Sequence, residues 1–227
     1  MNDIYISGTG IWTPPYKVSN DELVESFNKY VDLYNLEHTN EIKDGSIEPL
    51  VHSSSEFIVK ASGIKNRYVI EKEALLDPNR MKPQINARND DELSFSAEVS
   101  VIAAKEALNN AGLNPSDIDA VIVSAANLQR AYPAIAIEVQ NELGIEGFAY
   151  DMMVGCSAST FGINNAYCDI KSGKSSKVLV ISPEITSGHN NFKNRDGHFI
   201  FGDICTCLLY TSDAADDTPC VDLGGRR

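Results

Sequence analysis

Short apolar segments alternate with helical segments through the second half of the chain, and this alternation constrains the fold most. Asp119 to Ala126 and Lys177 to Ser182 are largely apolar runs, which fit strands buried on both faces of a sheet. Helices are expected over residues 133–143 and 157–172, with a strand over 148–154 between them. Strands separated by helices predict an α/β fold with a parallel-rich mixed sheet covered by helices.

The sequence also carries signals for the ends of helices. Ser19 with Glu22 three residues later has the pattern of a capping box, which predicts the start of a helix. A second helix is expected from Ser94, and Gly112 is a residue type that commonly ends one. Residues 36–53 are polar and irregular, so a surface insertion is expected there.

The composition indicates a globular protein with an acidic excess. The chain has 227 residues and a formal net charge of −13. Such a charge repels phosphate backbones and anionic membrane surfaces, so nucleic-acid binding is not expected. Apolar runs such as Ala120 to Val123 are too short to span a bilayer, and the N-terminus does not resemble a signal peptide. A cytoplasmic protein without membrane insertion is therefore expected.

The last residues resemble translated laboratory DNA rather than protein. Residues 207–217 resemble a translated transposase adapter, and residues 221–227 resemble the translated flow-cell adapter that follows it. A natural acidic tail is the alternative. We expect residues 1–206 to be a truncated N-terminal half and residues 207–227 to be a foreign tail, excluded from reasoning about the fold.

Cys156 is the candidate reactive residue. It follows an expected strand and Gly155, whose backbone permits a tight turn, and it precedes an expected helix. A helix N-terminus favours the reactive thiolate over the thiol, and the N–H of Cys156 could join an oxyanion hole. The spacing alone leaves a buried structural cysteine as an alternative. A serine nucleophile elbow is disfavoured because Ser159 stands where that motif needs glycine.

The other cysteines and two histidines are expected to be structural. Cys168 and Cys205 are predicted to lie in the core, and His189 and His198 in loops or at a strand edge. The five cysteines show no CxxC spacing, which indicates neither a disulfide framework nor a metal site: Cys156, Cys168, Cys205, Cys207 and Cys220.

An ordered set of motifs resembles the N-terminal half of the β-ketoacyl-acyl carrier protein synthase III family, within the thiolase superfamily. These motifs are Gly8-Thr9-Gly10, Ser55-Glu56-Phe57-Ile58, Gly63-Ile64-Lys65-Asn66-Arg67, the strand 118–123, Tyr132-Pro133-Ala134, Tyr150-Asp151 with Cys156, and Arg195 before Phe201-Gly202-Asp203. The resemblance implies a thiolase-like fold, N-terminal half.

The resemblance also implies an activity in fatty acid biosynthesis. An acyl-CoA primer would acylate Cys156, and malonyl-acyl carrier protein would then lose CO₂ and attack the acyl-cysteine. No cofactor beyond the coenzyme A thioester substrate is implied, and the full-length enzyme would be a homodimer. The family's decarboxylating His and Asn lie in the other half, so the fragment itself is expected to be inactive and poorly soluble.

Three further residues acquire roles from the resemblance. Tyr132 matches an aromatic residue that limits primer length in the neighbouring subunit, and Arg195 matches an arginine near the coenzyme A nucleotide. Phe57 and Ala61 stand where acetyl-CoA-primed enzymes place a Trp and an Arg around adenine. This departure resembles a medium-chain branch that accepts acyl-CoA of about octanoyl length, because the stacking and cation–π attraction would be weaker.

Two rival interpretations remain open from the sequence. One is another thiolase-superfamily acyltransferase, such as a hydroxymethylglutaryl-CoA synthase or a polyketide-type synthase. The other is a non-catalytic fragment in which Cys156 is structural.

Overall fold

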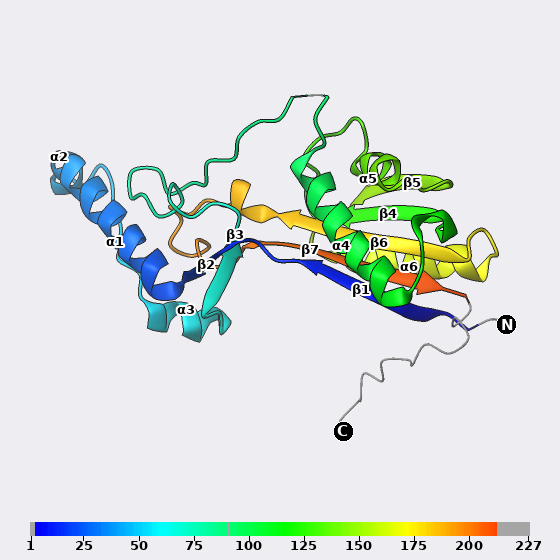
Figure 1. The fold of residues 1–227 in the computed structure, drawn as a ribbon. Helices are drawn as coiled ribbons and strands as arrows, with labels where there is room; N and C mark the ends of the chain where they lie inside the picture. The colour runs from blue at the N-terminus through cyan, green and yellow to red at the C-terminus, as the bar shows by residue number, and fades with distance from the viewer. Residues whose placement is uncertain (1–2, 90, 213–227) are drawn as a thin grey trace, which may run out of the picture. The chain divides into compact units, whose positions relative to one another are not determined.

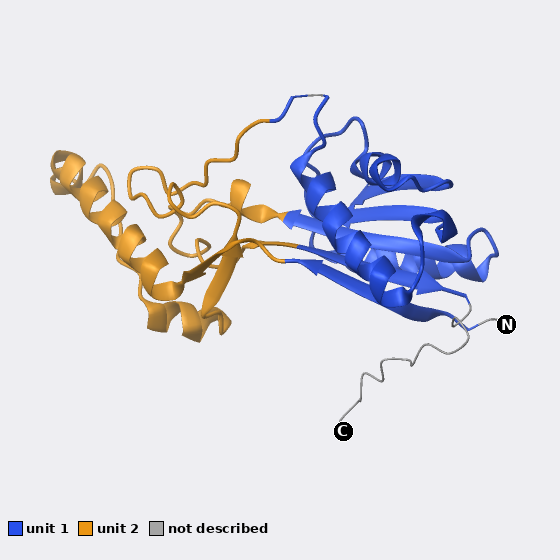
Figure 2. Cartoon of the chain, in the orientation of Figure 1, with its two compact units in different colours: residues 1–12, 88–184, 205–227 blue, residues 13–87, 185–204 orange. Residues whose placement is uncertain are grey.

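The computed structural model describes residues 3–89 and 91–212. The chain forms two compact units (Figure 2). Unit 1 comprises residues up to 12, 88–184 and 205 onward, and unit 2 comprises residues 13–87 and 185–204.

Unit 1 is built on a five-stranded sheet (Figure 1). Its strand order is β1 (Tyr5–Trp12), β7 (Asp203–Thr211), β6 (Lys177–Ile185), β4 (Ala120–Ala125) and β5 (Phe148–Met153). β4 pairs in parallel with both β5 and β6, whereas β1 and β7 are antiparallel. The predicted parallel-rich mixed sheet is confirmed.

Three long helices cover this sheet. They are α4 (Phe95–Ala111), α5 (Ile135–Leu143) and α6 (Ala158–Lys171). The first two end at Gly112 and Gly144, both in the left-handed conformation that glycine adopts without steric cost. A short 3₁₀ turn (Pro115–Asp117) leads into β4.

The two faces of β4 pack on different helices. Ala120 and Ile122 belong to a buried cluster with Ala166 and Ile170 of α6. Alternate residues of a strand point to opposite faces, so Val121 faces the other side, where α4 lies (Figure 1). The sheet is therefore the middle layer between α4 and α6.

Two glycines of β1 allow α4 to approach closely. A Cβ added to Gly8 would lie 2.1 Å from the carbonyl oxygen of Ala107, and one added to Gly10 would lie 1.9 Å from that of Ala103. Any side chain at either position would have to displace the helix backbone.

Unit 2 is smaller and combines helices with a two-stranded antiparallel sheet. Its elements are the antiparallel strands β2 (Tyr16–Ser19) and β3 (Asn66–Val69), the helices α1 (Asn20–Glu37), α2 (Thr39–Lys43) and α3 (Ser55–Ser62), and the 3₁₀ turn Thr186–Gly188. The predicted capping box is present, with Ser19 and Glu22 bonded reciprocally. Lys72 also hydrogen-bonds Glu22 and lowers the pKa of that carboxyl to about 2.

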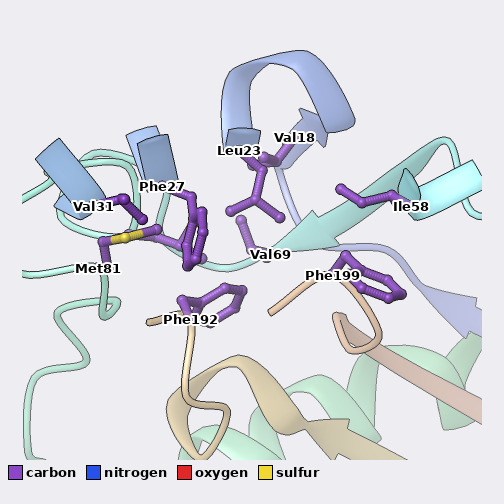
Figure 3. Packing of buried hydrophobic residues seen from close by; sticks show 10 residues of the cluster. Val18, Leu23, Phe27, Val31, Ile58, Val69, Met81, Phe192 and Phe199 are labelled. Atoms are coloured by element: carbon purple, nitrogen blue, oxygen red, sulfur yellow. The ribbon is translucent and has the colours of Figure 1, made fainter. Parts of the chain in front are cut away.

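The core of unit 2 is aliphatic and aromatic (Figure 3). Its buried side chains are Val18, Leu23, Phe27, Val31, Ile58, Val69, Leu75, Met81, Phe192 and Phe199. They come from α1, α3, both strands, the segment that follows β3 and the 185–204 segment. This core anchors the loop that carries Arg195.

Two local predictions were incomplete and one was wrong. The sequence did not indicate β2, and α2 forms inside the expected irregular insertion. Cys168 is exposed rather than in the core. Ala166 and Ile170 are buried, and Cys168 lies two residues from each. Two residues correspond to about 200° around a helix, so the Cys168 side chain points away from the buried face. Cys205 is buried as predicted.

The last strand passes residue 206. β7 continues to Thr211, and Cys207 and Leu209 are buried within it. The foreign origin of residues 207–227 stays a prediction. Residues 213–227, which include Cys220, lie outside the described residues.

Candidate active site

Cys156 lies in the turn between β5 and α6. β5 ends at Met153, and Gly155 follows with a φ of +58°, which makes the tight turn that its position predicted. Cys156 sits in the 3₁₀ turn Gly155–Ser157 as an exposed free cysteine. No side chain caps the start of α6, so its first-turn N–H groups can face a negative charge.

Hydroxyl groups of the sheet fix the start of α6. Ser124 Oγ of β4 donates to the carbonyl oxygen of Ala158, and Ser159 Oγ donates to Ser182 Oγ of β6 at 2.9 Å. Gly162 lies so close to the sheet that an added Cβ would be 2.9 Å from the Ser124 side chain. The helix that follows Cys156 is thus held against two neighbouring strands.

Tyr132 lies on the segment between β4 and α5. Its side chain is 90% exposed, and the Tyr132–Pro133 peptide bond is cis. α5 begins three residues after Tyr132, and its first two residues donate backbone hydrogen bonds to Asp151 of β5. Asp151 therefore connects the strand that leads to Cys156 with the segment that carries Tyr132.

Two carboxyl groups in this part of unit 1 have perturbed pKa values. Burial raises the pKa of Asp151, against the opposing effect of the backbone N–H groups of Ala136 and Ile135. Burial likewise raises the pKa of Glu184, which accepts a hydrogen bond from Ala126. Neither carboxylate could be given a role from the sequence, because their hydrogen-bond partners are distant in the chain.

Unit 2 brings Phe57 and Arg195 together. The Arg195 guanidinium carbon lies 4.2 Å from the centroid of the Phe57 ring, and Arg195 Nε donates to the carbonyl oxygen of His52 at 2.9 Å. Phe199 packs edge-on against Phe57 with ring centroids 5.9 Å apart. Cys156 and Tyr132 belong to unit 1, whereas this cation–π pair belongs to unit 2.

Asp203 is a buried residue that the resemblance included without giving it a role. Its carboxylate accepts from Ser187 N and Ser187 Oγ, each at 2.7 Å, and from Ile70 N at 3.0 Å. Burial raises the pKa of this carboxyl. Asp203 thus ties both ends of the segment that carries Arg195 to β3.

The two histidines of this segment differ. His189 is exposed, as expected of a loop residue. His198 is fully buried, so its prediction as a loop or strand-edge residue was incomplete: the ring stacks on Phe27 with centroids 4.6 Å apart. Its Nδ1 lies 2.8 Å from the carbonyl oxygen of Arg195. Burial lowers the pKa of His198, so a neutral, structural imidazole is favoured.

The described residues form neither a metal-binding cluster nor a membrane-spanning helix. Within residues 3–89 and 91–212, no cluster of three or more His, Cys, Asp or Glu side chains could hold a metal ion. In that same part of the chain, no helix has the length and apolar character needed to cross a membrane.

The sequence matches one family and curated relatives. Residues 150–223 match the family described as 3-oxoacyl-[acyl-carrier-protein (ACP)] synthase III. A beta-ketodecanoyl-[acyl-carrier-protein] synthase of Pseudomonas aeruginosa is 54% identical over 186 residues, which cover 82% of this chain and 53% of that protein. A beta-ketoacyl-[acyl-carrier-protein] synthase III of Agrobacterium fabrum is 32% identical over 176 residues, which cover 77% of this chain and 48% of that protein.

The fold also matches solved structures. The crystal structure of 3-oxoacyl-[acyl-carrier-protein] synthase III from Aquifex aeolicus aligns with a TM-score of 0.68 at 26% identity, covering 95% of this chain and 55% of that one. The chain spans about half the length of the curated relatives it matches.

Proposed function

We propose that the complete protein is an acyltransferase that carries out a decarboxylative Claisen condensation. The proposal starts from the family to which this chain belongs, 3-oxoacyl-[acyl-carrier-protein] synthase III. Its fold is thiolase-like, as in the synthase structures with which it aligns. The observation that carries the proposal is the exposed Cys156 at the uncapped start of α6, in the turn that follows a parallel strand.

The first step is transfer of an acyl group to Cys156. The thiolate attacks the thioester carbonyl of an acyl-CoA, a new carbon–sulfur bond forms, and coenzyme A leaves as its thiol after taking up a proton. The N–H groups at the start of α6 can stabilise the oxyanion of the tetrahedral intermediate.

The second step forms the carbon–carbon bond. Malonyl-acyl carrier protein loses CO₂, and the resulting carbanion attacks the acyl-Cys156 carbonyl. The bond to sulfur breaks, which regenerates the thiolate and releases a β-ketoacyl product. The resemblance assigns the decarboxylation to a His and an Asn outside the matched motifs of this chain, so the step is tested on the complete protein.

A medium-chain acyl-CoA is the favoured primer. The Pseudomonas relative is named for a ketodecanoyl product, which corresponds to an eight-carbon primer extended by two carbons. Phe57 and Ala61, at the positions where acetyl-CoA-primed enzymes carry Trp and Arg, are consistent with a primer other than acetyl-CoA.

Coenzyme A binding and dimer formation use other surfaces. The Phe57–Arg195 pair offers an aromatic face and a cation to the nucleotide part of the acyl-CoA. Within the described residues β5 pairs with β4 alone, so its other edge can accept a strand of a second copy. A cytoplasmic homodimer that uses no cofactor other than its thioester substrates is the assembly we propose.

The origin of the last residues is a separate proposal. We propose that residues 1–206 are encoded by the source gene and that residues 207–227 come from a sequencing adapter. The adapter-like residues 207–217 and 221–227 support this proposal, whereas the family match, which reaches residue 223, favours a natural continuation. Sequencing the source DNA past the codon for Thr206 decides between a continuing synthase frame and a natural tail.

The test of the function is a turnover assay of the complete protein. We expect octanoyl-CoA and malonyl-acyl carrier protein to give a ten-carbon β-ketoacyl product and CO₂ in equal amounts. Cys156→Ser is expected to lose this activity, whereas the matched control Cys168→Ser, on the exposed face of α6, is expected to keep it. Equal activity of both variants would refute the proposal.

A further inference from the structure

The segment between β4 and α5, residues 126–134, is fastened at its first residue by a carboxylate. The N–H of Ala126 donates to Glu184 Oε1 at 2.7 Å. Glu184 lies near the carboxyl end of β6, and Ala126 follows the carboxyl end of β4. Because β4 and β6 are parallel, these two strand ends lie side by side at the carboxyl edge of the sheet. Cys156 follows the end of the parallel strand β5 at that edge.

A second carboxylate holds the other end of the segment. Ile135 N donates to Asp151 Oδ2 at 2.8 Å, and Ala136 N donates to Asp151 Oδ1 at 2.7 Å. The N-cap residue of α5 is Ala134, which provides no side-chain cap. Asp151 thus caps α5 from a neighbouring strand, using both oxygens.

Two side chains, Gln129 and Arg130, hold the middle of the segment. Gln129 Oε1 accepts a hydrogen bond from Ser96 N of α4 at 2.9 Å. Arg130 donates to the carbonyl oxygen of Glu92 at 3.3 Å and lies 3.9 Å from the buried carboxylate of Glu138. The backbone around Tyr132 is therefore supported on both sides, while the ring itself projects into solvent with 90% of the side chain exposed.

We propose that Glu184 and Asp151 are positioning residues that hold the 126–134 segment, fix where Tyr132 projects, and thereby set which acyl chain lengths the enzyme accepts. This inference rests on the proposed function. An exposed aromatic ring can select a substrate by its position only if its backbone cannot shift, and these two carboxylates supply the fixed points.

The two carboxylates differ in how a conservative variant behaves. Glu184 accepts one N–H bond, and the carbonyl oxygen of a glutamine can accept the same bond. Asp151 accepts two, and an asparagine offers only one acceptor and turns its NH₂ group toward the second N–H. Glu184→Gln is therefore expected to behave like wild type, whereas Asp151→Asn is not.

The experiment measures primer selectivity in the complete protein. The readout is the ratio of kcat/KM for octanoyl-CoA to that for butanoyl-CoA. We expect Glu184→Ala, Asp151→Ala and Asp151→Asn to change this ratio by about fivefold or more, and Glu184→Gln and the exposed control Glu142→Gln to change it less than about twofold. The change in this ratio in Tyr132→Ala is the reference with which the carboxylate variants are compared.

Double variants separate positioning from general damage. If both carboxylates act through Tyr132, adding Glu184→Ala to Tyr132→Ala changes the ratio little further. A ratio that stays at the wild-type value in folded Glu184→Ala and Asp151→Asn, or effects that add fully to that of Tyr132→Ala, overturns the proposal. Asp151→Asn carries the test if an alanine variant does not fold.

Hydrogen exchange distinguishes failure of this inference from failure of the proposed function. The amides of Ala126, Ile135 and Ala136 are expected to exchange about tenfold faster in the alanine variants. Faster exchange with unchanged selectivity reduces the two carboxylates to structural residues and overturns the inference. A wild-type protein that no acyl-CoA acylates refutes the proposed function itself.

Discussion

Cys156 in unit 1 and the Phe57–Arg195 pair in unit 2 are held in different ways. In unit 1, Gly162 lets α6, the helix that follows Cys156, lie directly against the sheet, and at the other edge of the sheet Gly8 and Gly10 let β1 lie directly against α4. In unit 2, the Phe57–Arg195 pair is supported by side chains, namely Phe199 and the hydrogen-bonded Asp203. Backbone packing tolerates no added atom, whereas side-chain contacts can readjust. The difference fits the proposed roles, in which Cys156 carries the chemistry and the Phe57–Arg195 pair binds the substrate.

The largest effect is expected where backbone packing is closest. In Gly10→Ala the new Cβ would start 1.9 Å from the carbonyl oxygen of Ala103. Separating the strand and the helix is expected to lower the free energy of unfolding by about 3 kcal/mol or more. Urea denaturation of the complete protein measures the change.

The control for Gly10→Ala lies in unit 2. Gly197 has an ordinary backbone conformation, and an added Cβ would be 3.6 Å from Asn194 Nδ2. Gly197→Ala is expected to change the free energy of unfolding by less than about 0.5 kcal/mol. Equal losses in both variants would remove the contrast between backbone and side-chain support.

Local sequence signals predicted much of the fold and the place of Cys156. The capping box at Ser19, the left-handed glycine that ends α4, and the strand–glycine–cysteine–helix order are set by neighbouring residues. The similarity of the chain to the synthase family is also confirmed. What lay within a few residues in the sequence could be predicted.

Contacts between distant residues could not be predicted. Glu184 accepts its hydrogen bond from Ala126, 58 positions away, and the helix carbonyl that a Cβ added to Gly10 would meet belongs to Ala103. The exposed position of Cys168 depends on which face of α6 meets the sheet. Carboxylates and glycines are common, and only the fold shows which of them meet a buried donor or a backbone.

A large effect is also expected from the buried carboxylate of unit 2. Asp203→Ala leaves the N–H and hydroxyl of Ser187 and the N–H of Ile70 without their acceptor. Leaving these donors without a hydrogen-bond acceptor is expected to lower the free energy of unfolding by about 3 kcal/mol. Denaturation of Asp203→Ala beside Asp196→Ala, an exposed carboxylate of the same loop, measures it; similar losses in both would contradict the role given to Asp203.

A smaller, kinetic effect sharpens the division between binding and chemistry. Phe57→Ala and Arg195→Ala each remove one partner of the cation–π pair. We expect KM for octanoyl-CoA to rise by about fivefold, with kcat within about twofold of wild type, because the lost contact stabilises ground and transition states alike. Steady-state kinetics of the complete protein checks this. A fall in kcat at unchanged KM would place the pair in the chemical step instead.

The smallest effect concerns the ion pair that stabilises the start of α1. The pKa of Glu22 is lowered to about 2 in the folded protein, so the stability it contributes is present above its unfolded pKa of about 4.3 and is lost as the pH falls towards 2. The pair is partly exposed, so Glu22→Gln is expected to cost less than about 1 kcal/mol at pH 7. Thermal unfolding at pH 7 and pH 2 measures it; a difference that grows at low pH would contradict the assigned direction.

The most direct test is to find where the acyl group binds. The complete protein is incubated with octanoyl-CoA alone, digested, and mapped by mass spectrometry. We predict one octanoyl group on the peptide that contains Cys156, with release of one coenzyme A per acylated chain. An octanoyl group on the exposed Cys168 with none on Cys156, or no acylation at all, would contradict it.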